Sequence, residues 1–278
     1  MKNKNLQAIE SYLSRELDPA FARRARLIAE NLNITGKEQI LEIGCGRGFY
    51  EQFLGTIYPK VKLTGVDLKE SYLNIARHTV KSKNVTFLNA DATQLPFKAN
   101  TFDRIIATEV LEHIPNDLGV LSELYRVVKP GGIVMITVPN KQYSALWDPL
   151  NYLLEKLFHV HVPSNIWWLA GIWADHVRLY DEPELMTKIK GARFQIKKIW
   201  RSTHYCVPFS HFLLYGIGKN IVERGFFPSM NRFESDQPPS PLIKLVHSFI
   251  YSQDGKNNDS EKVGINTMNL VLKARKKM

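Results

Sequence analysis

The chain has 278 residues, of which 44% are hydrophobic and 23% are charged, a composition typical of a globular protein with a buried core. Its two cysteines, Cys45 and Cys206, exclude a disulfide-rich scaffold, and no apolar run has the length of a signal peptide or a membrane-spanning helix. We therefore expect a cytoplasmic protein that forms a single domain over residues 1–278.

The formal net charge of +10 is unevenly distributed. Residues 1–140 hold 18 Lys and Arg against 15 Asp and Glu, whereas residues 141–278 hold 19 against 12. A basic excess suits an anionic partner such as nucleic acid or a phospholipid surface, but it is equally compatible with solubility alone. Composition leaves these alternatives open.

Strand-like and helix-like patterns alternate through the first half of the chain. Residues 6–32 have helical periodicity, and the strand patterns that follow are QILEIG, VKLTGVD, VTFLNAD, FDRIIATEV and GGIVMITVPN. Strands that alternate with helices predict right-handed crossovers and a mostly parallel sheet covered on both faces. We therefore predict a Rossmann-like, doubly wound α/β fold, with a ligand-binding core at residues 38–140.

The pattern changes after Asn140. DPLNYLLEKLF predicts a helix with one apolar face, made of Leu150, Leu153, Leu154, Leu157 and Phe158. A tryptophan-rich stretch and a further helix follow, and strand patterns return in RFQIKKIWRS and TMNLVLKARKK. We predict helical, aromatic cap insertions after the fifth and sixth strands, at residues 141–190 and 203–266, and a last strand at 267–277.

A glycine-rich turn, ILEIGCGRGFY, follows the first predicted strand and places Gly44, Gly46 and Gly48 before a helix. Glycines allow positive φ and let backbone N–H groups approach a ligand, and the positive end of the helix points to the same place. Glu42 would repel a pyrophosphate there, and Phe49 breaks the dinucleotide-binding spacing. The turn therefore suits a ligand that is cationic or neutral at this point.

Acids also end the next two strands. Asp67 can accept hydrogen bonds from both hydroxyls of a ribose, and Asp91 with Ala92 stands where an adenine edge could be recognised. Carboxyl ends of parallel strands meet at one edge of a sheet, so these acids form a crevice for a positively charged adenosine. The alternative is that Asp67 and Asp91 only cap the segments that follow them.

ILEIGCGRG, LTGVD, NADATQLPF, FDRIIATEVLEHI and VVKPGGIVMITVPN, in this order, resemble the class I S-adenosylmethionine-dependent methyltransferases. The resemblance covers residues 38–140 and resumes in HVRLYDEPELMTKIKGARFQI. It implies that S-adenosylmethionine is the cofactor, with its methionine part at Glu42 and the Gly44–Gly48 loop, its ribose at Asp67 and its adenine at Asp91 and Ala92. The full predicted cofactor set is Glu42, Gly44, Cys45, Gly46, Gly48, Asp67, Leu68, Asp91, Ala92 and Glu109.

The segment TEVLEHI places Glu109, Glu112 and His113 on one face if it is helical. It resembles the ubiquinone-pathway O-methyltransferases and the small-RNA 2′-O-methyltransferases, in which the matching residues bind a metal. The resemblance implies Mg²⁺, or another divalent ion, at these three residues. The alternative is a structural or cofactor-adjacent role for Glu109. Without a metal, His113 and His176 are the candidate catalytic bases.

The aromatic insertions should lie over the methyl donor and suit a small or lipophilic acceptor, methylated at oxygen. Together with the basic excess they also make an anionic membrane surface a candidate partner, and a membrane-peripheral location a second candidate. Nucleic acid is the less favoured partner because no RNA-binding module is present. Two alternatives stay open: an RNA 2′-O-methyltransferase and a cofactor-binding module without chemistry.

Overall fold

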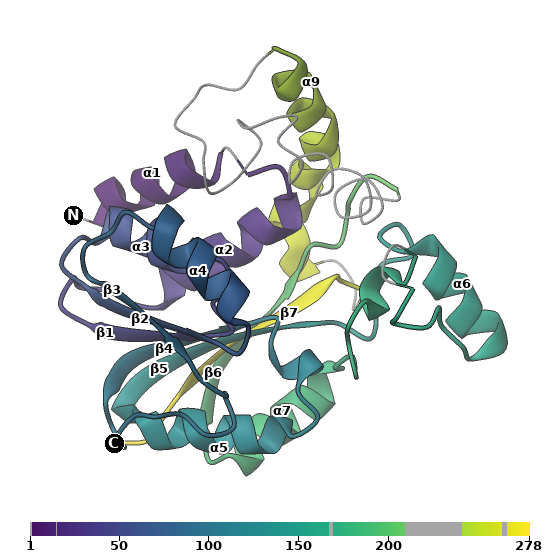
Figure 1. Cartoon of the computed structure of the whole chain (residues 1–278). Helices are drawn as coiled ribbons and strands as arrows, with labels where there is room; N and C mark the ends of the chain where they lie inside the picture. Colours follow the sequence, from purple (N-terminus) through teal and green to yellow (C-terminus); the bar gives the residue numbers. More distant parts are fainter. Residues whose placement is uncertain (1, 15, 167–168, 209–240, 263–265) are drawn as a thin grey trace.

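The carboxyl ends of the strands form the edge of the molecule that carries the predicted site (Figure 1). The computed structural model describes residues 2–14, 16–166, 169–208, 241–262 and 266–278. Within them one sheet has seven strands in the order β3-β2-β1-β4-β5-β7-β6. The strands are β1 Gln39–Ile43, β2 Lys62–Asp67, β3 Val85–Asn89, β4 Phe102–Thr108, β5 Val128–Pro139, β6 Gln195–Ser202 and β7 Asn269–Arg275.

Strands β1 to β5 pair in parallel, while β7 runs antiparallel to both of its neighbours, β5 and β6. The predicted mostly parallel, Rossmann-like sheet is therefore confirmed. The antiparallel β7 starts at the edge where the other strands end, because Asn269 pairs with Pro139 and with Ser202. This arrangement brings the beginning of the last strand to the predicted site.

Helices cover both faces of the sheet (Figure 1). One buried cluster joins the sheet to α1 (Lys2–Leu13), α2 (Pro19–Asn31) and α3 (Phe49–Ile57). A second joins the other face to α5 (Asp117–Val127) and α7 (Glu182–Gly191). The helix α4 (Glu70–Thr79) follows β2. The two clusters make the layered core that holds the strand ends in place.

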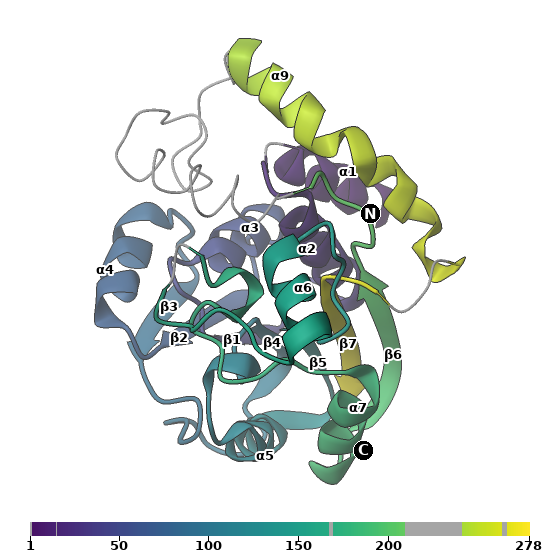
Figure 2. The same cartoon turned by 90° about the vertical axis from the view of Figure 1, so that its right-hand side faces the viewer.

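The first insertion differs from its prediction at its end. Residues 182–190 were expected in a cap, but α7 buries Leu185 and Ile189 in the same cluster as the sheet, so this segment is part of the α/β core. The cap is formed by α6 (Pro149–Phe158) and the short 3-10 helix η2 (Gly171–Trp173). Both views place α6 beyond the carboxyl ends of the strands (Figures 1 and 2).

Only part of the second predicted insertion is described. Its described elements are α9 (Pro241–Ile250) and the 3-10 helix η5 (Tyr251–Lys262). Four aromatic residues of the predicted second insertion, Phe209, Phe212, Phe226 and Phe227, lie outside the described residues. Among the described residues no helix is both long and apolar enough to cross a membrane.

Candidate active site

The glycine-rich loop has the backbone that the sequence predicts. Gly44, Gly46 and Gly48 have φ values of 64°, 53° and 81°, a left-handed region that other residues rarely adopt. A Cβ at Gly48 would lie 2.7 Å from Val80 Cγ2, whereas one at Gly46 would meet no heavy atom within 4 Å. Gly48 is therefore required by packing, and Gly46 leaves the backbone open at the start of α3.

Two buried carboxyl groups lie beneath this loop. Glu42 in β1 is 4% exposed and Glu51 in α3 is 0% exposed. Gly65 pairs with Glu42 in the sheet, and a Cβ on Gly65 would lie 2.5 Å from Glu51 Oε1, so the Glu51 carboxyl rests on bare backbone. Apart from each other's carboxyl group, Glu42 Oε2 and both Glu51 oxygens receive no side-chain hydrogen bond from the described residues.

Burial is the largest cause of the raised pKa values of Glu42 and Glu51. Burial, and then the neighbouring Glu51, raise the pKa of Glu42 well above its usual range. Burial also raises the pKa of Glu51 to about 7, with a further upward contribution from the charge of Asp67. A cationic group that arrives beside Glu42 would favour its ionised form. The donor-poor acid pair therefore fits the positively charged part of the predicted cofactor.

Asp67 connects the glycine loop to the second strand. Its Oδ2 accepts a hydrogen bond from Gly46 N at 2.8 Å, and its Oδ1 accepts one from Lys69 N at 2.8 Å. A carboxylate has about four acceptor sites, so these bonds leave capacity for ligand hydroxyls. Leu68, next to it, is 70% exposed. Asp67 does not cap α4, whose N-cap is Lys69 without a side-chain cap bond, and the remaining acceptor sites of Asp67 fit the predicted ribose-binding role.

Asp91 also orders its own turn at the end of the third strand. Its Oδ1 accepts hydrogen bonds from Thr93 N and Thr93 Oγ1, both at 2.7 Å, and these bonds lower the pKa of Asp91. The neighbouring Ala92 is half-buried and packs against the core. Glu42, Asp67 and Asp91 thus stand at the ends of three adjacent strands.

Glu109 does not share a helical face with Glu112 and His113, which corrects the predicted metal-binding set. Its φ is +51°, and the following η1 (Leu111–His113) is a 3-10 turn. Glu109 Oε1 accepts from Thr137 Oγ1 at 2.7 Å, and Oε2 accepts from Asn269 Nδ2 at 2.8 Å. The left-handed backbone directs this carboxylate toward β5 and β7.

A different set of three residues comes together: Glu112, His113 and His176, with one ligand atom from each within 4.8 Å of the others. Two hydrogen bonds hold the segments side by side. His113 Nδ1 lies 2.8 Å from Asp175 O, and Val177 N donates to Glu112 O at 2.9 Å. The candidate bases His113 and His176 are therefore adjacent, with ring centroids 4.6 Å apart.

The chemistry of this set follows from its hydrogen bonds. A carbonyl oxygen only accepts, so His113 Nδ1 donates to Asp175 O and a neutral ring keeps its lone pair on Nε2. Glu112 is 0% exposed, and neither carboxylate oxygen has a hydrogen-bond partner among the described residues. Burial, and then the charge of Glu109, raise the pKa of Glu112 well above its usual range. The set could act as a base or hold a cation.

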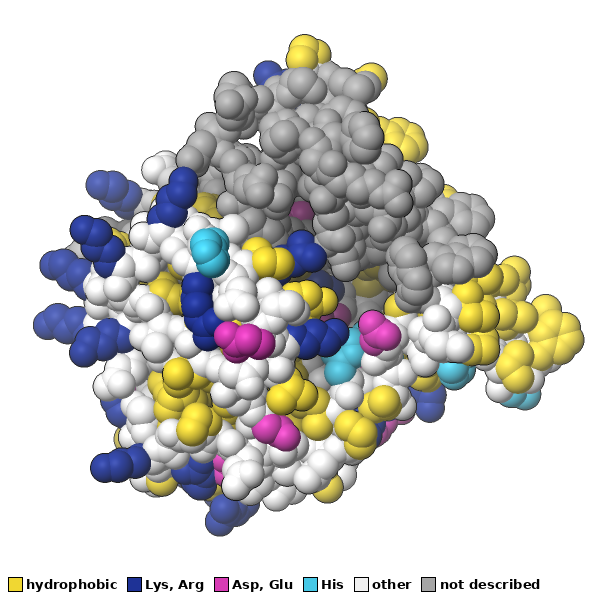
Figure 3. All heavy atoms as spheres, in the orientation of Figure 1, with side chains coloured by type: hydrophobic (Ala, Val, Ile, Leu, Met, Phe, Trp, Pro, Cys, Tyr) yellow, Lys and Arg dark blue, Asp and Glu magenta, His cyan; other side chains and the backbone are white. Residues whose placement is uncertain are grey.

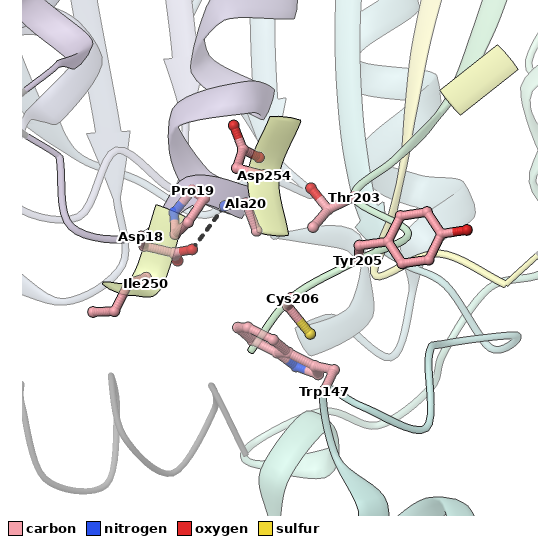
Figure 4. A pocket seen from close by; sticks show the side chains of 9 residues that line it. All are labelled: Asp18, Pro19, Ala20, Trp147, Thr203, Tyr205, Cys206, Ile250 and Asp254. Carbon is pink, nitrogen blue, oxygen red and sulfur yellow. Dashed lines mark hydrogen bonds between the residues drawn. The ribbon is translucent and has the colours of Figure 1, made fainter. Parts of the chain in front are cut away.

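A small cavity lies where α2 begins, near the end of β6 (Figure 4). Trp147 comes from the first insertion, Thr203 and Cys206 from the segment after β6, and Ile250 and Asp254 from the second insertion. Its volume of about 10 Å³ suits about one water molecule. The aromatic insertions do meet here, but this cavity is too small for a ring-sized acceptor.

Comparison with known proteins agrees with the geometry at the strand ends. Residues 41–136 match the methyltransferase domain family. Over 161 residues the chain is 36% identical to the demethylmenaquinone methyltransferase of Lactococcus lactis, a match that covers 56% of this chain and 61% of the relative. Residues 41–136 are thus a methyltransferase domain, and the similarities of the chain are consistent with the class I S-adenosylmethionine-dependent methyltransferases.

Two other proteins are similar to this chain. The sterol 24-C-methyltransferase of Pneumocystis carinii is 32% identical over 118 residues, which cover 41% of this chain and 31% of that protein. The structure of phosphoethanolamine N-methyltransferase 2 of Haemonchus contortus, in complex with S-adenosyl-L-methionine, has a TM-score of 0.58 at 19% identity. The likeness covers 98% of this chain and 57% of that chain, and it shows a shared fold.

The matched part of the chain thus spans about three fifths of the first relative's length.

Several site residues lie outside the sequence predictions. Glu51 was missed because an acid in the first turn of a helix is an ordinary partner of the helix dipole. Arg24 and Asn269 were missed because they are 245 residues apart, although Arg24 Nη1 donates to Asn269 Oδ1 at 2.7 Å.

Proposed function

We propose that this chain transfers the methyl group of S-adenosylmethionine to an oxygen of a small or lipophilic acceptor. The observation that carries the proposal is the set of acids at three adjacent strand ends, Glu42, Asp67 and Asp91, around an open glycine loop. Relatives named for demethylmenaquinone and sterol methylation favour a lipophilic acceptor.

The cofactor-binding roles follow from the chemistry of each group. Glu42 would face the cationic methionine part, Asp67 the ribose hydroxyls, and Asp91 with Ala92 the adenine. Gly46 fits this assignment because its backbone is open while its N–H holds Asp67 in place. When bound, the cofactor supplies an electrophilic methyl group on a sulfonium.

We assign the proton transfer to His113. The cofactor would supply the methyl group to the acceptor oxygen and leave as its demethylated product, while His113 Nε2 would take the proton of the acceptor hydroxyl. The bond from His113 Nδ1 to Asp175 O keeps Nε2 unprotonated in the neutral ring. His176 is the second candidate base because it lies beside His113.

A divalent cation at Glu112, His113 and His176 is the alternative to this base, because His113 Nδ1 is bonded to Asp175 O and Nε2 cannot both ligate a cation and take the proton. The support is the fully buried Glu112 carboxylate without a hydrogen-bond partner among the described residues, next to two imidazoles. Two imidazoles and one carboxylate suit Mn²⁺ or Zn²⁺ better than the Mg²⁺ expected from the sequence. Glu109, with its carboxylate bonded to Thr137 and Asn269, is excluded from this ligand set.

The methyl-transfer proposal is tested with radiolabelled S-adenosylmethionine and a panel of hydroquinones, phenols and sterols, with structured RNA as the alternative acceptor. We expect label in a lipophilic acceptor and a large loss in His113→Gln, with cofactor binding unchanged. His78→Gln, which changes an exposed histidine of α4, is the matched control. Label in RNA alone would favour the RNA 2′-O-methyltransferase, and cofactor binding without transfer to any acceptor would favour the module without chemistry.

The cation is tested by exhaustive chelation followed by readdition of Mn²⁺, Zn²⁺ or Mg²⁺. If the cation takes part, chelation and Glu112→Gln abolish transfer but leave the affinity for the cofactor unchanged, and calorimetry detects Mn²⁺ binding to wild type only. Full activity after chelation would refute the cation and leave His113 as a base.

A further inference from the structure

The helix α6 leaves much of its predicted apolar face exposed: Leu150 and Leu154 are half-buried, and the other three residues of that face are exposed. Leu153, Leu157 and Phe158 belong to that face, and they are 55%, 66% and 67% exposed. The buried residue of the helix is instead Asn151, at 0% exposure. A surface helix normally places its apolar stripe against the core, so this orientation needs an explanation.

Buried polar bonds fix this orientation. Asn151 Nδ2 donates to Asp148 Oδ2 at 2.7 Å and to Ala170 O at 2.9 Å, while Asn151 Oδ1 accepts from Val162 N at 2.8 Å. Asp148 Oδ2 also accepts from Ile172 N at 2.9 Å. These bonds account for the inward side of α6, so the outward apolar side is a built feature of the fold.

The exposed apolar side extends beyond the helix. The exposed large apolar residues between 141 and 166, here called the α6 patch, are Leu146, Leu153, Leu157, Phe158 and Val160. Figure 3 shows hydrophobic side chains gathered at the end of the molecule where Figure 1 places α6.

The exposed charged side chains of the segment that carries the patch are cationic. Among the described residues 141–166 the exposed charged side chains are Lys141 and Lys156. The two acids of this stretch are engaged, because Asp148 is buried and Glu155 accepts a hydrogen bond from Trp173 Nε1. An apolar surface with cations at its border complements an anionic lipid surface.

We infer that α6 docks on an anionic phospholipid bilayer and places the α6 patch among the lipid chains. With ten residues the helix is too short to span a bilayer, so it would lie along the interface. A second copy of the chain is a poorer occupant, because each copy carries a net charge of +10.

Docking of α6 would also bring the lipid toward the histidine pair. Trp173 stacks on His161 with centroids 4.0 Å apart and donates to Glu155 of α6, and the same segment continues to His176. A lipophilic acceptor could then enter from the bilayer. The docking itself does not depend on the proposed methyl transfer, because it requires only the patch and its charges.

The test is flotation of the full chain with phosphatidylcholine vesicles, with and without phosphatidylglycerol. We expect flotation that needs phosphatidylglycerol and weakens with salt, and a decrease of at least about tenfold in the partition coefficient of L157S/F158S, because both apolar side chains leave water on docking. Lys156→Glu should weaken flotation on anionic vesicles. Leu118→Ser is the matched control, since Leu118 in α5 is 55% exposed but far from α6 in sequence.

The unfolding midpoint of L157S/F158S should equal that of wild type, which shows that the fold is retained. Absence of flotation on both kinds of vesicle would overturn the docking. An equal loss of flotation in Leu118→Ser would also overturn it. Light scattering that shows a dimer dissociated by L157S/F158S would assign the patch to a second copy and would also overturn it. Methyl transfer is measured separately, on a detergent-dispersed acceptor, so a failure of either proposal is recognised by itself.

Discussion

At the scale of single residues, the buried Glu51 makes the stability of the protein depend on pH. Its folded-state pKa is about 7, raised by burial, whereas an unfolded glutamate titrates near 4.3. As pH rises through this interval, Glu51 loses its proton first in the unfolded chain. The contribution of Glu51 to stability therefore falls between about pH 4 and 7 and is constant above that range. Glu51→Gln should therefore be more stable than wild type at pH 8, by on the order of 1–3 kcal/mol.

Urea denaturation at pH 4.5 and pH 8 measures this difference. The gain should be much smaller at pH 4.5, where Glu51 is protonated in the folded state and about half protonated in the unfolded chain. Glu70→Gln changes an exposed acid paired with Arg77 and should shift stability by less than about 1 kcal/mol. The same gain at both pH values would show that it comes from packing and not from ionisation.

The Asp67 carboxylate should contribute a large part of the cofactor affinity. Asp67→Ala removes the acceptor for the ribose hydroxyls and also releases Gly46 N, and we expect a loss on the order of 2–3 kcal/mol, or roughly 30–150-fold in Kd. Calorimetry with S-adenosylmethionine and with its demethylated product measures it. Asp103→Ala, an acid at the opposite end of β4, should leave the affinity unchanged. Equal affinities of Asp67→Ala and wild type would refute the ribose assignment.

At the scale of elements, α6 should respond to substitution in the reverse of the usual order. Asn151→Ala leaves the buried Val162 N without its partner and removes one of the two bonds to Ala170 O, which keeps the bond from Trp173 N, and we expect a cost of about 1–3 kcal/mol. Leu153→Ala removes a mostly exposed side chain and should cost less than about 0.5 kcal/mol. Urea denaturation and limited proteolysis near residue 160 compare the two variants. A larger loss in Leu153→Ala would mean that the leucine side packs inward.

The same helix shows how far sequence patterns reach. Helical periodicity correctly predicted α6 and the stripe of Leu153, Leu157 and Phe158, but a stripe does not tell which side faces the core. The orientation depends on Asn151 bonding to Ala170, a contact across a loop that no local pattern contains. The prediction that Glu109 shares a helical face with Glu112 and His113 was wrong for a related reason. Its spacing suits a helix, but the backbone turns to φ +51° there.

At the scale of the whole molecule, the strand ends were predictable and the contacts between distant segments were not. Gly44, Asp67 and Asp91 each stand at the end of their own strand, so a parallel sheet brings them to one edge. Arg24 belongs to α2 and Asn269 to the last strand, and their meeting depends on β7 being inserted between β5 and β6. Sequence spacing over 245 residues carries no signal of that kind.

This contact ties both ends of the chain to the site. Arg24 is 9% exposed and donates to Asn269 Oδ1, while Asn269 Nδ2 donates to Glu109 Oε2, which lies 3.6 Å from Arg24 Nη1. Arg24→Met removes the cationic partner of the buried Asn269 Oδ1 and of the half-buried Glu109 carboxylate, and we expect a loss of about 1–3 kcal/mol in the free energy of unfolding.

A double-mutant cycle of Arg24→Met with Asn269→Ala tests whether the three groups act as one network. Because both substitutions break the same bond, the double variant should lose at least about 1 kcal/mol less than the sum of the single losses. Arg26→Met is the matched control, since its partner Glu10 is exposed and such pairs contribute less than about 1 kcal/mol. Additive losses in urea denaturation would show that Arg24 stabilises α2 alone. In that case α2 and the last strand reach the site independently.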